Sequence, residues 1–189
     1  MSAAAYAERG DAILTRLPAG VTHGVEVGVF LGQLSRYLLE NLPGLHLTLV
    51  DPWARAEPGS RYHASGEWHG TLTHWQQESF YRETLGRTDE FSARRTVLRM
   101  PSVQAATRVP DGSQDFVFID GEHTYEAVCE DIAAWKPKVR PGGLLCGHDY
   151  ANYQFPFGYT VEQAVHEAAD ANGWTVDVGE NFTWFCRVD

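Results

Sequence analysis

The chain has 189 residues, of which 43% are hydrophobic and 12% aromatic, so it can bury a core of its own and is not a disordered segment. Fifteen basic against 25 acidic residues give a formal charge of −10 without any Lys- or Arg-rich run, which argues against a nucleic acid partner. No apolar run approaches the ~18 residues that cross a membrane, and the start lacks a signal peptide pattern. We therefore expect a single cytoplasmic domain over residues 1–189, with no membrane partner and with its three scattered cysteines reduced.

Strand and helix patterns alternate along the chain after a first helix at residues 3–17. Strands are expected at 24–30, 45–51, 95–100, 115–120 and 142–149, followed by two strands joined by a turn within 174–188. Further helices are expected at 31–44, 73–86 and 123–136, and from a capping box of Thr160 and Gln163 to Gly173. Such alternation predicts an α/β fold in which helices cover both faces of a mostly parallel sheet.

Residues from about 53 to 92, here called the insertion segment, interrupt this alternation. The segment is longer than a crossover connection needs, and before the helix at 73–86 its sequence is typical of a loop. Long loops in compact domains are usually functional lids or disordered. The aromatic residues Tyr62, Trp68 and Trp75 favour a lid.

The first strand ends in VEVGVFLG, at the place where ligands bind to an open parallel sheet, beyond the carboxyl ends of its strands. Gly28 would let the backbone approach a ligand closely, and Gly32 would open the next helix with no side chain in the way. The spacing is E-x-G-x-x-x-G and not GxGxxG, because Glu26 replaces the first glycine. A carboxylate there would repel a pyrophosphate and attract the cationic amino acid end of a ligand such as S-adenosylmethionine.

Asp51 and the residues after the third strand complete this half of the predicted site. Asp51 ends the second strand, where a carboxylate can accept hydrogen bonds from both ribose hydroxyls, although an Asp-Pro turn explains it equally. Met100 and Ser102 follow the third strand, where they would flank an adenine ring. Ser102 also fits a helix N-cap.

The stretch FIDGEHTYE places Asp120, Gly121 and His123 directly after the fourth strand, and His148 and Asp149 end the fifth. Because neighbouring strands lie about 5 Å apart, the carboxylates of Asp120 and Asp149 are expected to converge on one ion. Two carboxylates with open positions suit Mg²⁺, whereas a nitrogen ligand from His148 would favour Mn, Fe or Zn. Gly121 would make the turn that brings His123 into the same cleft as a base.

These residues also have purely structural interpretations. Asp120 would otherwise cap the following helix or hold a turn, and Asp149 would lie away from any ion. Glu122 is a competing candidate for the base, and His148 fits a hydrogen-bonded polar residue as well as a ligand.

Two further groups of residues invite a functional interpretation. His63, His69 and His74 lack a neighbouring cysteine or an H-x-x-x-H pair, so we expect solvated loop histidines and not a zinc site. The aromatic run at residues 150–159 either forms a wall of an acceptor pocket or packs under the edge of the sheet.

Two stretches together carry a resemblance to a known family: GVEVGVFLGQLSRYLLENLPGLHLTLVDPW and DFVFIDGEHTYEAVCEDIAAWKPKVRPGGLLCGHDY. They resemble the class I S-adenosylmethionine-dependent methyltransferases, and among these the group with macrocin and mycinamicin sugar O-methyltransferases and cephalosporin-hydroxylase-like proteins. The resemblance covers residues 21–150 apart from the insertion segment. It implies a Rossmann-like three-layer sandwich with a mostly parallel seven-stranded sheet whose last strand is antiparallel.

The resemblance also implies roles for particular residues. The residues expected to bind S-adenosylmethionine are Glu26, Gly28, Gly32, Asp51, Met100, Ser102 and Asp120. Asp120 and Asp149 would hold a divalent metal, with His123 as the base. Those enzymes commonly carry an acidic residue just before the second metal carboxylate, and His148 in its place leaves the identity and the need of the metal open.

The expected activity is methyl transfer from S-adenosylmethionine to a hydroxyl of a small molecule such as a sugar, phenol or natural product. Two alternatives remain open: a metal-independent methyltransferase acting on nitrogen or carbon, and a Rossmann nucleotide-binding protein without methyltransferase activity. The acceptor is not specified by the sequence, and a homo-oligomer is left open.

Overall fold

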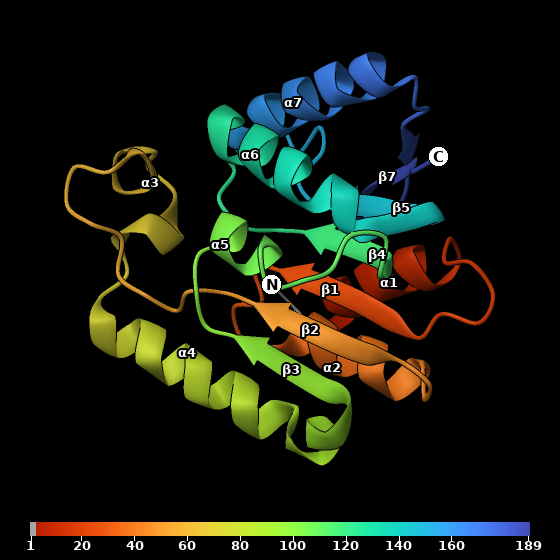
Figure 1. Ribbon diagram of the computed structural model, residues 1–189. Helices are drawn as coiled ribbons and strands as arrows, with labels where there is room; N and C mark the ends of the chain where they lie inside the picture. Colours follow the sequence, from red (N-terminus) through yellow and green to blue (C-terminus); the bar gives the residue numbers. More distant parts are fainter. Residues whose placement is uncertain (1–2) are drawn as a thin grey trace.

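The structure is a computed structural model that describes residues 3–189, with side chains from Tyr6 onward. Within that range seven strands form one sheet in the order β3-β2-β1-β4-β5-β7-β6 (Figure 1). They are β1 (His23–Val27), β2 (His46–Val50), β3 (Arg95–Leu98), β4 (Gln114–Ile119), β5 (Val139–Gly147), β6 (Asp177–Val178) and β7 (Trp184–Arg187). Strands β1 to β5 pair in parallel, whereas β7 pairs antiparallel with β5 and β6. The predicted α/β fold, with a mostly parallel sheet and an antiparallel last strand, is confirmed.

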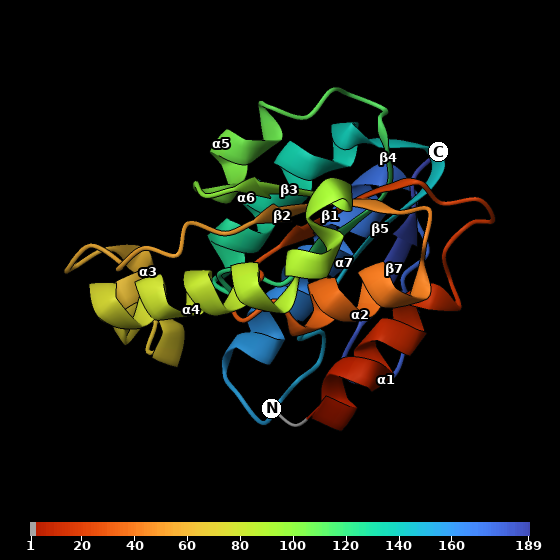
Figure 2. The same ribbon diagram turned by 90° about the horizontal axis from the view of Figure 1, so that it is seen from below.

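Helices cover both faces of this sheet (Figures 1 and 2). One face carries α1 (Ala3–Leu14), α2 (Gln33–Asn41) and α4 (His74–Arg87). The other carries α5 (Ser102–Ala106), α6 (Tyr125–Trp135) and α7 (Phe157–Asn172). Shorter helices are α3 (Arg61–Ala64), η1 (Trp68–Thr71), η2 (Asp89–Arg94) and η3 (Lys136–Lys138). Two hydrophobic cores result, one on each side of the sheet.

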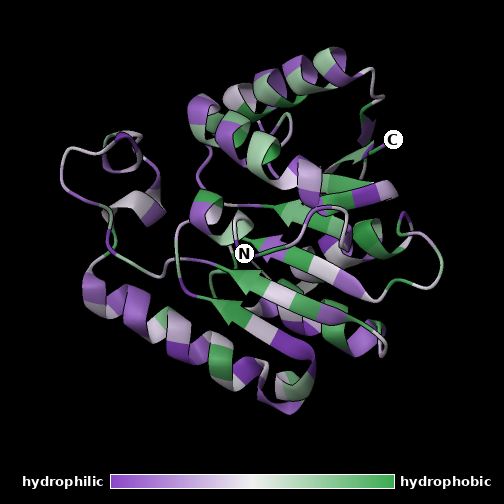
Figure 3. Ribbon diagram, in the orientation of Figure 1, coloured by the Kyte–Doolittle hydropathy of each residue, from purple (hydrophilic) through white to green (hydrophobic). Residues whose placement is uncertain are grey.

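The central strands are apolar on both faces because each face meets a helical layer. All six residues of β4 are buried, and in β1 only His23 is exposed. Alternate residues of β4 enter opposite cores: Val117 lies in the core under α5 to α7, and Phe116 in the core under α1 and α2. Figure 3 shows hydrophobic residues gathered in the strands, whereas α4 is mostly hydrophilic. The part of the chain that the structure describes contains no helix long and apolar enough to cross a membrane.

One helix start differs from its prediction. The prediction that Thr160 and Gln163 form a capping box at the helix start was wrong, because α7 begins at Phe157, one turn earlier. Pro156 already has helical dihedral angles and sets the start, and Thr160 donates its hydroxyl proton back to the carbonyl of Phe157 or to that of His123. The predicted end is confirmed, since Gly173 caps the helix in the left-handed conformation with φ 69°.

The insertion segment is more structured than its loop-like sequence predicts. It contains α3 and η1 before α4, and α3 lies beyond the arrowheads of β1 and β2 (Figure 1). Trp53, at its start, is 1% exposed and anchors the segment in the core beside α2. The segment therefore extends over the edge of the sheet where the strands end.

The tips of β1 and β4 touch at Gly28. Gly28 has φ 83°, its N–H donates to the carbonyl of Val50 at 2.9 Å, and a Cβ there would lie 2.0 Å from the carbonyl oxygen of Asp120. Only a residue without a side chain fits between these strand ends.

Replacing Gly28 by alanine is therefore expected to force β1 and β4 apart. Gly112→Ala is a matched control, because Gly112 also has a positive φ, of 63°, and has no atom within 4 Å of an added Cβ. We expect the control to cost only the backbone strain, about 1–3 kcal/mol, and Gly28→Ala to cost distinctly more. Urea denaturation measures both, and equal losses would contradict the steric argument.

Candidate active site

A cavity of about 1380 Å³ opens beyond the carboxyl ends of β1, β2, β4 and β5. The reversal of strand order between β1 and β4 places it where open α/β sheets bind ligands. Its lining includes Gly28 and Asp51 on one side and Asp120, His123 and Asp149 on the other. Both halves of the site predicted from the sequence therefore share one cavity.

The turn after β1 is held by the carboxylate of Asp51. Its Oδ2 accepts hydrogen bonds from the backbone N–H groups of Val29 and Phe30, both at 3.0 Å, and its Oδ1 accepts from that of Trp53 at 2.7 Å. Burial raises the pKa of Asp51, and these three N–H groups oppose the rise. Asp51, which was predicted to bind ribose, thus also holds the loop at Gly28, and its bond from Trp53 fits the Asp-Pro turn considered in the sequence.

Glu26 on β1 lines the same half of the cavity and is 2% exposed. Its carboxylate accepts a hydrogen bond from the hydroxyl of Ser35 at 2.5 Å. Burial raises the pKa of Glu26 to about 8, and the bond from Ser35 only partly offsets this. Without a cationic ligand in the cavity, the Glu26 side chain is therefore mostly neutral at pH 7.

The remaining residues predicted to bind the cofactor differ in their position. Ser102 lines the cavity, but Met100 packs against the core and is not part of the lining. Gly32 precedes α2 with φ 70°, and it lies against Thr84 and not at the cavity surface. Their assignment as cofactor ligands stays a prediction.

A buried carboxylate lies beside Ser102. Asp131 on α6 is 5% exposed, lines the cavity and accepts a hydrogen bond from Ser102 Oγ at 2.5 Å. Trp135 Nε1 donates to the same hydroxyl at 2.8 Å. Burial raises the pKa of Asp131 to about 6. This places a polar group where the adenine ring of a nucleotide was expected.

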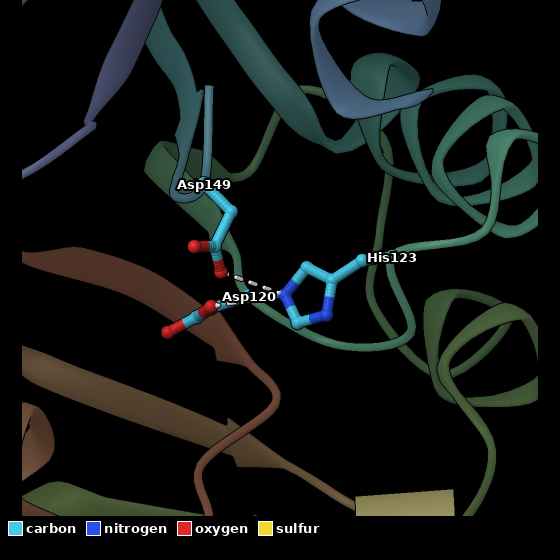
Figure 4. A group of neighbouring side chains, drawn as sticks. All are labelled: Asp120, His123 and Asp149. Atoms are coloured by element: carbon cyan, nitrogen blue, oxygen red, sulfur yellow. Dashed lines mark ion pairs between the residues drawn. The ribbon is translucent and has the colours of Figure 1, made fainter. Parts of the chain in front are cut away.

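The second half of the site brings Asp120, His123 and Asp149 together (Figure 4). Among the described residues these three form the group that could hold a metal ion, with one ligand atom from each within 4.8 Å of the others. His123 Nε2 lies 3.0 Å from Asp149 Oδ2 and 3.5 Å from Asp120 Oδ1. This nitrogen is buried and makes no hydrogen bond of acceptable geometry.

Local backbone geometry aims these side chains at one point. Asp120 directly follows β4, and its N–H donates to the carbonyl of Val27 at 2.7 Å, which fixes it against β1. Asp149 lies two residues after the end of β5. Its φ of 60° is a left-handed conformation that is uncommon for a residue other than glycine. Strain of this kind commonly persists at functional sites.

Arg9 on α1 lies in the same cluster and is 1% exposed. Its Nη1 donates to Asp120 Oδ2 at 2.5 Å, and its Nη2 lies 2.7 Å from His148 Nε2. The same His148 nitrogen lies 3.1 Å from Asn181 Oδ1, so it faces both a donor and an acceptor. Nδ1 lies 2.9 Å from Asp149 Oδ2. Like Nε2 of His123, Nδ1 of His148 is buried without a hydrogen-bond partner, and the role of His148 as a metal ligand stays a prediction.

The charges in the cluster shift each other's pKa values. Burial alone would raise the pKa of Asp120, but Arg9 and His148 lower it below its ordinary value. Burial would likewise raise the pKa of Asp149, and the two histidines hold it far below the usual range. Burial would lower the pKa of His123, but the surrounding carboxylates raise it well above 6.5.

The insertion segment supplies one of those carboxylates. Glu67 Oε2 lies 2.7 Å from His123 Nδ1. Arg61 donates to Glu122 at 2.8 Å and to Glu130 at 3.1 Å, which ties α3 to α6. Glu122, the competing candidate for the base, is thus engaged by Arg61 and also accepts from Thr124 Oγ1 at 2.6 Å.

The expectation of solvated loop histidines in the insertion segment holds for two of the three. His63 and His74 are exposed as predicted, but the prediction for His69 was wrong: its ring packs against that of Phe30 at 4.9 Å and lines the cavity. A loop histidine beside a large apolar ring is desolvated, and burial lowers the pKa of His69.

The aromatic run at 150–159 divides between the cavity lining and the core, and its role as a wall for an acceptor stays a prediction. Phe155 and Phe157 line the cavity, and the Phe157 ring stacks on that of His123 at 4.8 Å. Tyr150 is 8% exposed and forms part of the core, and Tyr153 and Tyr159 stack on each other at 4.6 Å.

Three residues of the site escaped the sequence prediction. Asp131 and Arg9 are charged residues within the apolar stripes of α6 and α1, and this position is a signal that the sequence contained. Glu67 has no such signal, because neither its spacing nor its neighbours distinguish it from other polar loop residues.

The family model described as a methyltransferase domain matches residues 25–150, which include both halves of the site. The chain belongs to this methyltransferase family. It is also 27% identical over 81 residues to the uncharacterized protein y4gI of Sinorhizobium fredii, a match that spans 43% of this chain and only 9% of that protein.

Solved structures of other proteins share the fold. Cofactor-bound Rv0187 from MTB covers 100% of this methyltransferase and 81% of its own chain, with a TM-score of 0.68 and 14% identity. The SAH-bound Podospora anserina methyltransferase PaMTH1 covers 96% and 78%, with a TM-score of 0.66 and 9% identity. A putative caffeoyl-CoA O-methyltransferase from Staphylococcus aureus covers 97% and 91%, with a TM-score of 0.63 and 13% identity. The expected class I methyltransferase fold is confirmed, while the narrower resemblance to macrocin O-methyltransferases stays a prediction.

The pKa of Glu26 generates a prediction about stability. In the ligand-free methyltransferase the folded pKa of about 8 lies above the ordinary value of 4.5, so the folded state binds the proton more tightly. This stabilising contribution is complete below pH 4.5 and is lost as the pH rises towards 8, at up to about 1.4 kcal/mol per pH unit. Glu26→Gln removes it.

The measurement is the free energy of unfolding of wild type and Glu26→Gln by urea denaturation between pH 5 and 8. The difference between the two should shift in favour of the variant as the pH rises, and all other titrating groups cancel. Glu57→Gln, at an exposed position of the insertion segment, is the control and should follow wild type. A pH-independent difference for Glu26→Gln would contradict the raised pKa.

Proposed function

We propose that this methyltransferase transfers a methyl group from S-adenosylmethionine to a hydroxyl of a small molecule, assisted by a divalent cation and by His123 as base. The observation that carries the proposal is the single cavity in which Gly28 and Asp51 face the cluster of Asp120, His123 and Asp149. Methyl transfer needs a donor and an acceptor held side by side, and alignment of this kind supplies about 7–11 kcal/mol of the barrier.

The first half of the cavity fits the cofactor. Gly28 and Asp51 both line this half, and the Asp51 carboxylate retains acceptor capacity for ribose hydroxyls. Glu26 offers a counter-charge to an α-amino group, and Asp131 offers an acceptor to an adenine amino group. Two structures of similar fold are described as cofactor-bound and SAH-bound, which supports the same ligand here.

The second half fits a divalent cation. Asp120, Asp149 and Glu67 gather around His123, with the guanidinium of Arg9 beside Asp120. The carboxylates that raise the pKa of His123 would also attract a doubly charged ion. The orphaned nitrogen of His123, aimed at both aspartates, is a further sign of a missing partner. Asp120 and Asp149 would hold the ion, which, when bound, would polarise the acceptor hydroxyl and lower its pKa.

The residues of the chain have distinct tasks in this reaction. Asp51 and Gly28 would hold the donor nucleotide at the ends of β1 and β2. His123 Nε2 takes the acceptor proton, and general bases of this kind contribute roughly 10²–10⁴-fold. The stacked rings of Phe157 and Phe155 give the acceptor an apolar wall. The insertion segment would exclude water, as a lid.

Transfer to oxygen is favoured over other acceptors by this combination of a base and a cation site. Solved structures of similar fold include a putative caffeoyl-CoA O-methyltransferase and the O-methyltransferase NovP, and these also support a hydroxyl acceptor. This apolar, aromatic wall is compatible with the acceptor classes expected from the sequence, which are sugars, phenols and other natural products.

A metal-independent methyltransferase is the second candidate, because one observation favours it. Arg9 already supplies a positive charge to Asp120 at 2.5 Å. If the guanidinium replaces the ion, activity is unchanged by EDTA. Loss of activity in EDTA and its recovery with Mg²⁺ support the first proposal.

The cofactor assignment is tested by thermal unfolding with S-adenosylhomocysteine, NAD or ATP, each with Mg²⁺, Mn²⁺, Zn²⁺ or EDTA. We expect S-adenosylhomocysteine to stabilise the fold by about 2.7 kcal/mol at a hundredfold excess over its Kd, because it binds only the folded state. Asp51→Asn should reduce this stabilisation. Stabilisation by NAD and none by S-adenosylhomocysteine would overturn the proposal.

The roles in the second half are separated by His123→Gln and Asp149→Asn, with the exposed His74→Gln as matched control. Mn²⁺ binding is followed by electron paramagnetic resonance, and transfer of labelled methyl to a panel of phenols and sugars by scintillation counting. Asp149→Asn should lose Mn²⁺ binding, whereas His123→Gln should keep it and lose about 10²–10⁴-fold in rate. If His123→Gln also loses Mn²⁺ binding, His123 is a ligand and not the base.

A further inference from the structure

Glu67 is a buried carboxylate in an otherwise exposed stretch. It lies between α3 and η1 and is 7% exposed, whereas its neighbours Gly66 and Trp68 are exposed. Burying a carboxylate is costly unless the group is hydrogen-bonded or paired. The contacts of Glu67 therefore have to account for its position.

Both carboxylate oxygens of Glu67 bind one residue. Oε1 accepts a hydrogen bond from the backbone N–H of His123 at 3.2 Å, and Oε2 lies 2.7 Å from ring Nδ1 of the same histidine. The main chain and the side chain of His123 are thus fixed by a single side chain. The ring of Phe157, stacked on the imidazole at an angle of 24°, blocks rotation from the other side.

These contacts determine which ring nitrogen is protonated. An ionised carboxylate only accepts hydrogen bonds, so the bond to Glu67 requires a proton on Nδ1. The lone pair of the neutral ring is then on Nε2, the nitrogen that faces Asp149 Oδ2 at 3.0 Å and Asp120 Oδ1 at 3.5 Å.

Without Glu67 the ring proton of His123 would move from Nδ1 to Nε2. Two carboxylates would compete for it at Nε2, whereas Nδ1 contacts no second acceptor among the described residues. A proton on Nε2 removes the lone pair that His123 needs, whether it serves as base or as ligand. In metal sites, mutation of a carboxylate that orients a histidine in this way typically lowers the metal affinity or the activity of the enzyme 10–100-fold.

We propose that Glu67 is a positioning residue that keeps the proton of His123 on Nδ1 and its Nε2 lone pair directed into the active site. The inference rests on the proposed function for the role of His123, but the contact itself does not. Because Glu67 belongs to the insertion segment, His123 is held in this orientation only when that segment is docked. Arg61, which ties the same segment to Glu122 and Glu130, does so without touching His123.

The experiment compares Glu67→Leu and Glu67→Gln with the exposed control Glu57→Gln in ¹⁵N-histidine-labelled protein. Long-range ¹H–¹⁵N spectra report which ring nitrogen of His123 is protonated, and His123→Gln assigns the signals. The wild type and Glu57→Gln are expected to show a downfield Nδ1 proton with or without Mg²⁺, since Nδ1 keeps its proton in both the neutral and the doubly protonated ring. Glu67→Leu should lose this proton to solvent exchange.

Glu67→Gln guards against a variant that fails to fold, because it has nearly the same shape. A neutral amide can accept at only one of the two His123 donors, and its hydrogen bonds are weaker than charge-assisted ones. We expect the Nδ1 proton of this variant to move upfield or disappear. An Nδ1 proton at the wild-type position in either Glu67 variant, or its absence from wild type, would overturn the proposal.

Ligand binding and amide hydrogen exchange distinguish the positioning role of Glu67 from a failure of the proposed function and from a purely structural role. Binding of S-adenosylhomocysteine to the wild type is measured by calorimetry, and its absence would count against the proposed function and not against the role of Glu67. Amide hydrogen exchange of residues 60–72 reports docking of the insertion segment. Faster exchange in Arg61→Ala, with an unchanged His123 spectrum, is expected if docking and positioning are separate. Faster exchange in Glu67→Gln, again with an unchanged spectrum, would show that Glu67 only anchors the segment and would contradict the proposal.

Discussion

A concentration of buried negative charge is the constraint around which this site is arranged. Asp120, Asp149 and Glu67 face one imidazole at the edge of the sheet, each with little exposure to water. Carboxylates in such a place are stable only with hydrogen bonds and positive partners. Arg9 from α1 supplies one charge, and the His148 ring lies between Arg9 and Asp149.

Those partners come from four distant parts of the chain, and the fold explains why they meet. The parallel strands deliver Asp120 and the loop with Asp149 to the same edge, since β4 and β5 are neighbours in one direction. The first helix packs on one face of the sheet and brings Arg9 to that edge, and the insertion segment brings Glu67 to the same edge. The site is therefore complete only in the assembled domain, and its chemistry depends on docking of a segment that has few buried residues of its own.

The two halves of the cavity are mechanically connected through the turn after β1. Asp51 fixes the backbone N–H groups of this turn, and the carbonyl of Phe30 in the same turn accepts hydrogen bonds from Trp53 Nε1 and Thr84 Oγ1, both at 2.9 Å. Trp53 and Thr84 belong to the insertion segment. The segment that orients His123 through Glu67 thus also supports the loop expected to hold the donor, which makes it a common element of both halves.

The sequence by itself determined the order and type of the main elements, because the periodicity of buried residues and the glycine and carboxylate positions at strand ends are local properties. It placed Gly28, Asp51, Asp120, His123 and Asp149 at one edge of a parallel sheet. Which nitrogen of His123 faces the aspartates, the association of Arg9 with Asp120, and the position of Glu67 were decided only by the tertiary structure. The reason is physical: hydrogen-bond partners separated by 56 and 111 residues are set by packing of whole elements, and no local pattern of residues encodes them.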